Sequence, residues 1–294
     1  MKRILLAVFL LVCASGLSAR SRVVTESFPS EVLGRNVSVN VYLPDGYGEL
    51  AATTYPVLYL LHGLYGTHLN WVETGGLDLV LDELIGTGEA AKMVVIMPCA
   101  GDPDIHAVQN GYFNVPGTPY EDFFFGELMP AFEAKYRCGG SKGMRAISGL
   151  SMGGGGSVVY AQRHPDMFSS CYAMSAWLDE KGGEVGGRNS EKDCFFYVCQ
   201  AVREHSAIDF LSSAGDATLE ELRSVKWFVD CGDDDFLLDL NLEFCRQMRE
   251  KGVKCELRVR NGIHNWEYWH ASLRLALPFA SRNFGRQSPI QPVF

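Results

Sequence analysis

Residues 144–163 read MRAISGLSMGGGGSVVYAQR, an apolar run, a glycine-rich turn and a second apolar run in immediate succession. The first run predicts a short strand that ends at Ser148, and the run beyond Gly153 predicts a helix that reaches Arg163. Between the two lies Ser151, at the centre of a Gly-x-Ser-x-Gly pattern. A strand that passes sharply into a helix strains the backbone of this serine, and flanking glycines remove Cβ atoms that would collide in the turn. The pattern therefore predicts a nucleophilic serine whose hydroxyl projects above the carboxyl edge of a sheet.

Outward from this turn, strand-like and helix-like segments alternate. Most of the strand-like segments are nearly continuous apolar runs, which suit strands covered on both faces of a parallel sheet. Strands are expected at residues 36–43, 57–61, 93–97, 144–148, 170–174, 225–230 and 254–260, and helices at 77–85, 120–136, 154–163, 236–251 and 266–283, the last interrupted near Pro278. Such alternation predicts an α/β fold of three layers, in which helices cover both faces of a mostly parallel central sheet.

Residues 178–224 interrupt this alternation. The stretch lies between two expected strands and contains Gly182-Gly183, Gly186-Gly187 and short helical pieces. We interpret it as an insertion over the carboxyl edge of the sheet, or a lid; an ordinary long crossover with one helix is the alternative. The organisation expected is one catalytic domain over residues 20–294 that carries this insertion.

Residues 1–19 have the pattern of a secretory signal peptide. Lys2 and Arg3 precede an apolar run from residue 4 to residue 12, and small residues follow up to Ala19. The apolar run is shorter than the ~20 residues that a membrane-spanning helix needs. Lipidation of Cys13 is disfavoured by the bulky residue just before it. We therefore expect cleavage after about Ala19 and a secreted or periplasmic chain without a stable membrane span.

The composition excludes several classes of protein. The 294 residues include 31 glycines, 47% hydrophobic and 21% charged residues, unlike a disordered or collagen-like chain. With 26 basic against 35 acidic residues, the formal net charge of −9 argues against a nucleic-acid partner. No zinc-like spacing and no His-Glu-x-x-His motif occur, so neither a metal nor another cofactor is expected. In an exported chain Cys194 and Cys199 could form a disulfide; the oligomeric state stays open.

His264 is the best candidate for the base that activates the serine, because a serine hydroxyl is a poor nucleophile until its proton is removed. It follows the last expected strand, in a loop over the carboxyl edge of the sheet. His164 lies at the far end of the nucleophile helix, and His270 lies inside the last helix, where a packed or surface histidine is the ordinary outcome. His62 belongs to a strand-ending turn with a different role.

The acid is expected between the serine and the histidine, after the strand at residues 225–230. The exit of this strand carries three adjacent carboxylates, Asp233, Asp234 and Asp235. They cannot all face one histidine, and Asp233 or Asp234 suits the N-cap of the next helix. The residues alone leave the choice open. An ionised acid would hold the imidazole tautomer and stabilise the imidazolium formed during attack.

An oxyanion hole needs two backbone N–H groups that point at the carbonyl oxygen of the substrate. Met152, directly after the serine, is the first candidate. Leu64 is the second, because Gly63 before it lets the backbone approach a substrate closely.

With serine, acid and histidine in this order, the chain resembles an α/β-hydrolase. More narrowly it resembles the putative-esterase group, which includes feruloyl and acetyl-xylan esterases, S-formylglutathione hydrolases of the esterase D type, and mycolyltransferases. The resemblance covers roughly residues 37–284 and rests on Leu60-Leu61-His62-Gly63 with Trp71 downstream, Gly149-Leu150-Ser151-Met152-Gly153-Gly154, Cys231-Gly232-x-x-Asp235-Phe236 and Gly262-x-His264-x-Trp266-x-x-Trp269. It implies Asp235, directly before the phenylalanine, as the triad acid, and Leu64 and Met152 as oxyanion donors.

The function expected is an exported serine carboxylesterase that acts on a small-molecule or polysaccharide ester, such as feruloyl or acetyl groups on plant polysaccharide, through an acyl-enzyme. Trp71 and Trp266 are candidate substrate-binding residues, since aromatic side chains suit a phenolic acyl group. Three alternatives stay open. They are an S-formylglutathione hydrolase, whose cytosolic substrate conflicts with the signal peptide, an acyltransferase of the mycolyltransferase type, and a non-catalytic polysaccharide-binding protein on a hydrolase scaffold.

Overall fold

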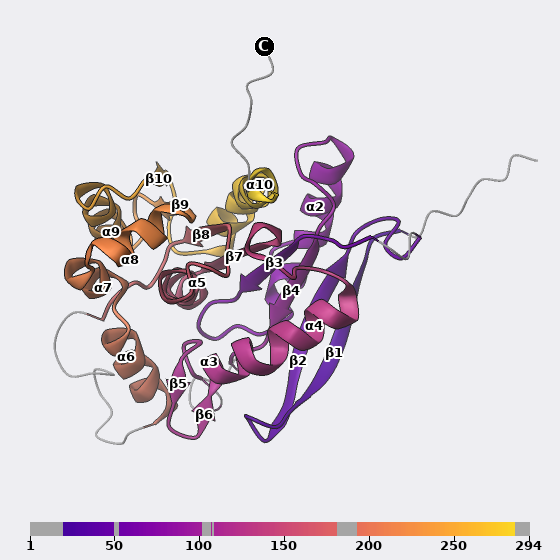
Figure 1. Ribbon diagram of the computed structural model, residues 1–294, viewed down its shortest axis with the longest axis horizontal. Coiled ribbons are helices and arrows are strands. Elements are labelled where there is room, and N and C mark those ends of the chain that lie inside the picture. Colours follow the sequence, from indigo (N-terminus) through magenta and orange to yellow (C-terminus); the bar gives the residue numbers. More distant parts are fainter. Residues whose placement is uncertain (1–19, 50–52, 102–106, 108, 181–192, 286–294) are drawn as a thin grey trace, which may run out of the picture.

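The computed structural model of the chain describes residues 20–49, 53–101, 107, 109–180 and 193–285. In this part of the chain an eight-stranded sheet forms the middle layer, in the order β1-β2-β4-β3-β7-β8-β9-β10 (Figure 1). Its strands are β1 (Arg22–Ser30), β2 (Arg35–Leu43), β3 (Val57–Leu61), β4 (Val94–Pro98), β7 (Arg145–Leu150), β8 (Ser170–Met174), β9 (Lys226–Gly232) and β10 (Cys255–Arg260). A separate two-stranded hairpin consists of β5 (Asn114–Val115) and β6 (Thr118–Pro119).

The sheet is mostly parallel. Every neighbouring pair from β4 to β10 runs in the same direction, whereas β2 pairs antiparallel with both β1 and β4. The carboxyl ends of β3, β7, β8, β9 and β10 therefore meet at one edge. In open α/β sheets, side chains carried on the loops beyond this edge form the ligand site.

Helices cover both faces of this sheet (Figure 1). Side chains of β3 alternate between the layers, since Leu58 and Leu60 pack toward α2 and α10 while Tyr59 and Leu61 pack toward α4 and α5. The helices are α1 (Asn70–Glu73), α2 (Leu77–Gly86), α3 (Tyr120–Phe123), η1 (Phe124–Leu128), α4 (Met129–Tyr136), η2 (Lys142–Met144), α5 (Met152–Arg163), α6 (Cys194–Glu204), α7 (Ala207–Ser213), α8 (Asp216–Arg223), α9 (Leu238–Glu250) and α10 (Trp266–Asn283). The expected three-layer α/β architecture is confirmed.

Two helices differ from their expected form. The helix expected at residues 120–136 contains a π-helical turn, Phe124–Leu128, between α3 and α4. The helix α10 is continuous through Pro278, where an interruption was expected. Leu277 and Phe279 on either side of the proline are buried against the sheet, and this burial holds the helix together where one backbone hydrogen bond is missing.

The insertion at residues 178–224 is described only in part. Its residues 193–224 form α6, α7 and α8, while residues 181–192, with both glycine pairs, lie outside the described residues, as does the expected signal peptide at residues 1–19. Cys194 and Cys199 are not joined: both are free thiols, and the Cys194 Sγ lies 2.7 Å from the Ala107 carbonyl oxygen. Over the described ranges, the structure contains no helix with the length and apolar character needed to cross a membrane.

Candidate active site

Ser151 occupies the sharp turn between β7 and α5. Its backbone dihedrals are φ 52° and ψ −116°, in a region that side-chain-bearing residues rarely adopt. The turn is held on both sides, because the Ser151 N–H donates to the Met174 carbonyl at 2.9 Å and the Trp177 N–H donates to the Ser151 carbonyl at 2.9 Å. Both partners belong to β8 and its exit. The neighbouring strand thus fixes the strained conformation of the serine.

Two of the glycines of the motif are required by close backbone approach. A Cβ atom at Gly149 would collide with the carbonyl of Gly153, and one at Gly153 would collide with the carbonyl of Leu61. Any side chain at either position would push α5 away from β3 and β7. The Gly-x-Ser-x-Gly pattern is therefore a packing requirement of this turn as well as a marker of chemistry.

The strain at Ser151 leads to a stability prediction. Replacing Ser151 by glycine should raise the free energy of unfolding by about 1–2 kcal/mol relative to Ser151→Ala, because glycine adopts this backbone conformation without a steric cost. Urea unfolding of both variants followed by circular dichroism measures the difference. Equal stability of the two variants would show that the turn carries no strain.

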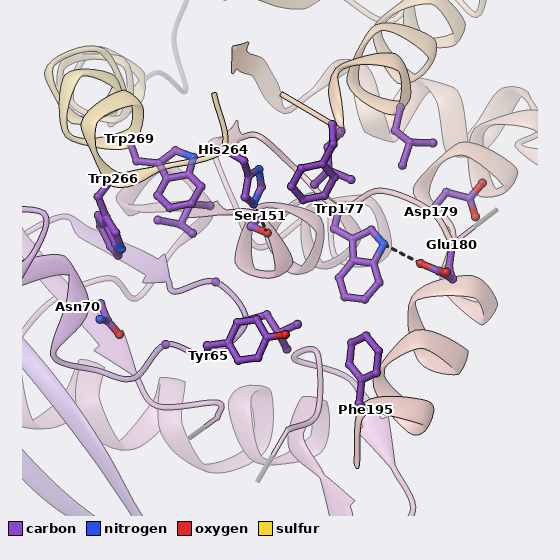
Figure 2. A pocket seen from close by; sticks show the side chains of 17 residues that line it. Tyr65, Asn70, Ser151, Trp177, Asp179, Glu180, Phe195, His264, Trp266 and Trp269 are labelled. Carbon is purple, nitrogen blue, oxygen red and sulfur yellow. Dashed lines mark hydrogen bonds between the residues drawn. The ribbon is translucent and has the colours of Figure 1, made fainter. Parts of the chain in front are cut away.

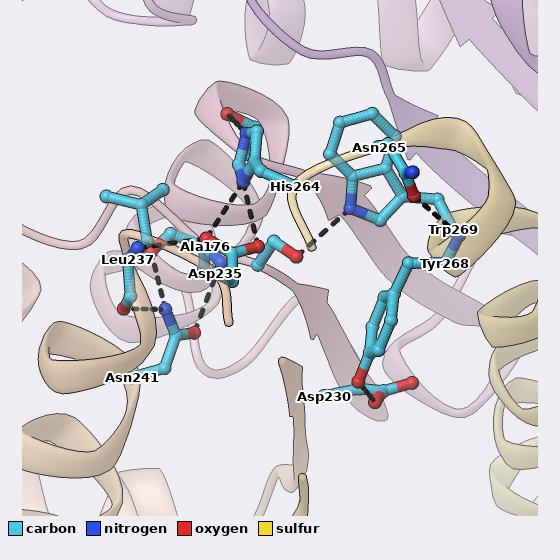
Figure 3. Close-up of polar contacts among 11 residues, drawn as sticks. Ala176, Asp230, Asp235, Leu237, Asn241, His264, Asn265, Tyr268 and Trp269 are labelled. Atoms are coloured by element: carbon cyan, nitrogen blue, oxygen red, sulfur yellow. Dashed lines mark hydrogen bonds and ion pairs between the residues drawn. The ribbon is translucent and has the colours of Figure 1, made fainter. Parts of the chain in front are cut away.

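The structure brings Ser151, His264 and Asp235 together at the carboxyl edge of the sheet. The His264 Nε2 lies 2.9 Å from the Ser151 Oγ, and the His264 Nδ1 lies 3.0 Å and 2.9 Å from the two carboxylate oxygens of Asp235 (Figure 3). The serine follows β7, the aspartate follows β9 and the histidine follows β10. With Nδ1–H donating to the carboxylate, Nε2 is free to accept the serine proton.

Among the three adjacent carboxylates, only Asp235 faces the histidine. Asp233 accepts the Gly262 N–H at 2.9 Å and thereby ties the loop after β10 to the loop after β9, and Asp234 is exposed. Burial by itself raises the pKa of the Asp235 carboxyl, but hydrogen bonds from His264, the Leu237 N–H and Ser175 outweigh it, so this pKa lies below its usual value. The carboxylate therefore stays ionised in neutral and mildly acidic solution, as an orienting acid requires.

A cavity of about 780 Å³ opens at the Ser151 hydroxyl (Figure 2). It is lined mostly by aromatic and aliphatic side chains, and Asp179 and Glu180 contribute carboxylates to the lining. The lining comprises Gly63, Leu64, Tyr65, Gly66, Asn70, Leu150, Ser151, Trp177, Asp179, Glu180, Phe195, Phe236, Leu237, Leu240, His264, Trp266 and Trp269. The volume falls in the range of small-molecule sites, about 300–1,000 Å³.

The two tryptophans expected to bind substrate have different positions. Trp266 lines the cavity, with Trp269 beside it (Figure 2). Trp71 does not: its side chain is 0% exposed, and its ring packs edge-on against Trp266 with centroids 5.4 Å apart. The expectation that Trp71 contacts a substrate directly is therefore wrong. Trp71 lies behind Trp266, which forms the wall of the cavity. Within the described residues, no group of three or more His, Cys, Asp or Glu side chains is arranged to hold a metal.

Residues 30–280 match a family model described as "Putative esterase". The chain belongs to this esterase family. It is 27% identical over 251 residues to an endo-1,4-beta-xylanase/feruloyl esterase from Xylanibacter ruminicola, covering 84% of this chain and 30% of that protein. A solved structure titled ferulic acid esterase is 45% identical, with a TM-score of 0.85, and the match covers 90% of this chain and 100% of that one.

A more distant structure carries the same architecture. An S-formylglutathione hydrolase from Staphylococcus aureus has a TM-score of 0.72 at 20% identity, with 90% of this chain and 100% of that chain covered, a likeness that shows the fold alone. The sheet topology and the match to the ferulic acid esterase structure confirm the α/β-hydrolase fold that the motifs of this chain predicted. The chain spans about 30% of the length of three curated relatives that it matches, among them the endo-1,4-beta-xylanase/feruloyl esterase.

The two expected oxyanion residues lie on different elements near Ser151. Met152 is the first residue of α5, so its N–H belongs to the first turn, where backbone donors have no partner within the helix. Its side chain is buried in the core. Leu64 lies on the loop after β3 and lines the cavity. A Cβ on Gly63 would meet the end of the Leu150 side chain at 2.5 Å, so any other residue before Leu64 would have to displace this side chain.

His62 anchors the loop that carries Leu64. Its Nδ1 lies 2.8 Å from the Gly63 carbonyl, and its Nε2 accepts the Ala100 N–H at 2.9 Å. Burial lowers the pKa of this imidazole to about 4, because the charged form would lose its hydration. The ring is thus neutral, and it connects the exits of β3 and β4.

The low pKa of His62 predicts a pH dependence of stability. Between pH 6.5 and about 4 the unfolded chain binds a proton at this histidine and the folded chain does not, so the free energy of unfolding should fall by about 1.4 kcal/mol per pH unit as the pH drops through this window. In His62→Gln this contribution disappears. Urea unfolding of both proteins at several pH values measures it, since other titrating groups cancel in the comparison. Parallel pH profiles for the two proteins would contradict the prediction.

Sequence reasoning missed two buried residues that support the site. The Ser175 hydroxyl accepts the Trp269 indole N–H at 3.1 Å and bonds to Asp235. Asn241, in α9, accepts the Ala176 N–H at 3.1 Å and donates to the Ala176 carbonyl at 2.9 Å. These contacts tie the exit of β8 to the loop of the acid (Figure 3). A polar asparagine on the apolar face of α9 was the available signal; no sequence signal distinguishes Ser175.

Proposed function

We propose that this chain is a serine esterase that removes aromatic acyl groups of the feruloyl class from plant cell-wall carbohydrate. The observation that carries the proposal is the hydrogen-bonded series Ser151–His264–Asp235 at the mouth of a cavity walled by aromatic side chains. The relatives titled feruloyl or ferulic acid esterase support this substrate class.

The geometry supports a two-step mechanism. The Ser151 Oγ attacks the ester carbonyl while the His264 Nε2 takes its proton, and Asp235 stabilises the imidazolium that forms. The N–H groups of Leu64 and Met152 bind the developing oxyanion. His264 then returns the proton to the leaving alcohol, and water, deprotonated by the same imidazole, releases the acid from Ser151.

The shape and chemistry of the cavity favour an aromatic acyl group. The side chains of Trp177 and Phe195 form one part of its wall and Trp266 and Trp269 another (Figure 2). Planar rings bury a flat phenolic group with large contact area and little loss of side-chain entropy. An acetyl group would leave most of about 780 Å³ unfilled.

A substrate panel tests the proposal. We expect the highest kcat/KM for methyl ferulate, a lower value for acetylated xylan, and little turnover of S-formylglutathione. Preference for S-formylglutathione would contradict the proposal and indicate an S-formylglutathione hydrolase of the esterase D type. The absence of any ester turnover would indicate a binding protein. Product analysis in the presence of a sugar alcohol separates hydrolysis from acyl transfer, because a transferase would yield a new ester.

We also propose that residues 1–19 direct export. Lys2 and Arg3, the apolar run after them and the small residues up to Ala19 support this localisation. N-terminal sequencing of the protein recovered from the secreting cell tests it, and an N-terminus at about residue 20 is the expected result.

A further inference from the structure

Large apolar side chains are exposed beside each part of the candidate site. In the described part of the chain, Tyr65 is 55% exposed, Phe236 is 76% exposed and Ile263 is 51% exposed. Each is the sequence neighbour of a site residue: Tyr65 follows Leu64, Phe236 follows Asp235, and Ile263 precedes His264. Exposed apolar groups gathered around a site indicate a surface that is covered when a ligand binds.

The backbone at Tyr65 is held in an unfavourable conformation. Its φ is 63°, and it occupies the third position of a turn closed by the Gly66 N–H and the Gly63 carbonyl at 3.1 Å. Glycine is the usual residue at such a position. A tyrosine there costs stability, and its side chain is 55% exposed, so burial of the ring does not account for its presence. Strain of this kind at a site points to a functional role for the side chain.

Phe236 extends the same surface from the other side of the site. Its ring lies 4.5 Å from the His264 ring, centroid to centroid, and it lines the cavity together with Tyr65. Figure 2 shows Tyr65 across the cavity from His264. The two rings therefore flank the point at which Ser151 meets the ester bond.

We infer that Tyr65 and Phe236 form a subsite for the sugar ring on the alcohol side of the ester. An ester held at Ser151 places its acyl group in the cavity, and its alcohol must remain at the mouth because a polysaccharide chain is too large to be buried. The C–H faces of a pentose or hexose carry partial positive charge and pack well on the negative face of an aromatic ring. This inference rests on the proposed function and adds a recognition element for the carbohydrate.

The test compares two substrates that share an acyl group and differ in their alcohol. The probes are methyl ferulate and a feruloylated arabinoxylo-oligosaccharide. In Tyr65→Gly and in Phe236→Ala, the ratio of kcat/KM for the oligosaccharide to that for methyl ferulate should fall about fivefold, a factor that corresponds to about 1 kcal/mol of lost contact. The fall should come from a higher KM for the oligosaccharide. Glycine suits the backbone at position 65, so the first variant should fold normally.

Leu79→Ala is the matched control, because Leu79 is 73% exposed and lies on α2, outside the cavity lining. Its ratio should equal that of the wild type. Equal ratios in all variants, with a wild type that cleaves both esters, would overturn the subsite and leave the proposed function standing. A wild type that cleaves neither ester would overturn the proposed function itself.

Discussion

Replacement of Ser151 by alanine should lower kcat for the best ester substrate by a factor on the order of 10⁴ to 10⁶. The serine Oγ is the only atom lost, and it lies 2.9 Å from the His264 Nε2 in a turn built to expose it. Without this oxygen no acyl-enzyme forms, and only the oxyanion donors and substrate binding remain. Initial rates with wild-type and variant protein measure the fall, and mass spectrometry should detect an acylated intermediate in the wild type alone.

The control for Ser151→Ala is Ser157→Ala, on the helix that follows. Ser157 is also buried, but its hydroxyl donates to the Gly153 carbonyl at 2.6 Å and does not face the cavity. Its kcat should match that of the wild type. If Ser151→Ala keeps substantial turnover while its circular dichroism is unchanged, another residue supplies the nucleophile.

The strands of the central sheet could be predicted because a strand buried on both faces has a nearly continuous apolar sequence. The strands β3, β4 and β8 are wholly buried apolar runs, and all the expected strands are found within two residues of their predicted bounds. The edge strand β1 was missed. Its side chains are mostly exposed or half-buried, so its sequence carries neither a continuous apolar run nor a clean alternation.

The site residues that could be predicted are those that local backbone geometry or the order of elements along the chain determines. Ser151 was marked by glycines that the turn requires, and His264 by its place after the last strand. The choice of Asp235 among three adjacent carboxylates needed the resemblance, since it depends on which way the loop after β9 turns. Trp71 was misplaced because an aromatic residue in a wall and one behind it have the same sequence pattern. Only packing distinguishes them.

Asp235→Asn should lower kcat by about 10⁴-fold, as expected for an asparagine that favours the wrong imidazole tautomer and cannot stabilise the imidazolium. The Asp235 carboxylate contacts the His264 Nδ1 at 2.9 Å and accepts the Leu237 N–H at 2.9 Å. An asparagine side chain has nearly the same size, and its amide oxygen can still accept the Leu237 N–H. Asp234→Asn is the matched control: the side chain is exposed, one residue away, and the charge change is the same. Because its pKa lies below the usual value, Asp235 remains ionised at pH 5 to 8, so the loss in Asp235→Asn should be seen throughout this range. A larger loss in Asp234→Asn than in Asp235→Asn would transfer the role of the acid to Asp234.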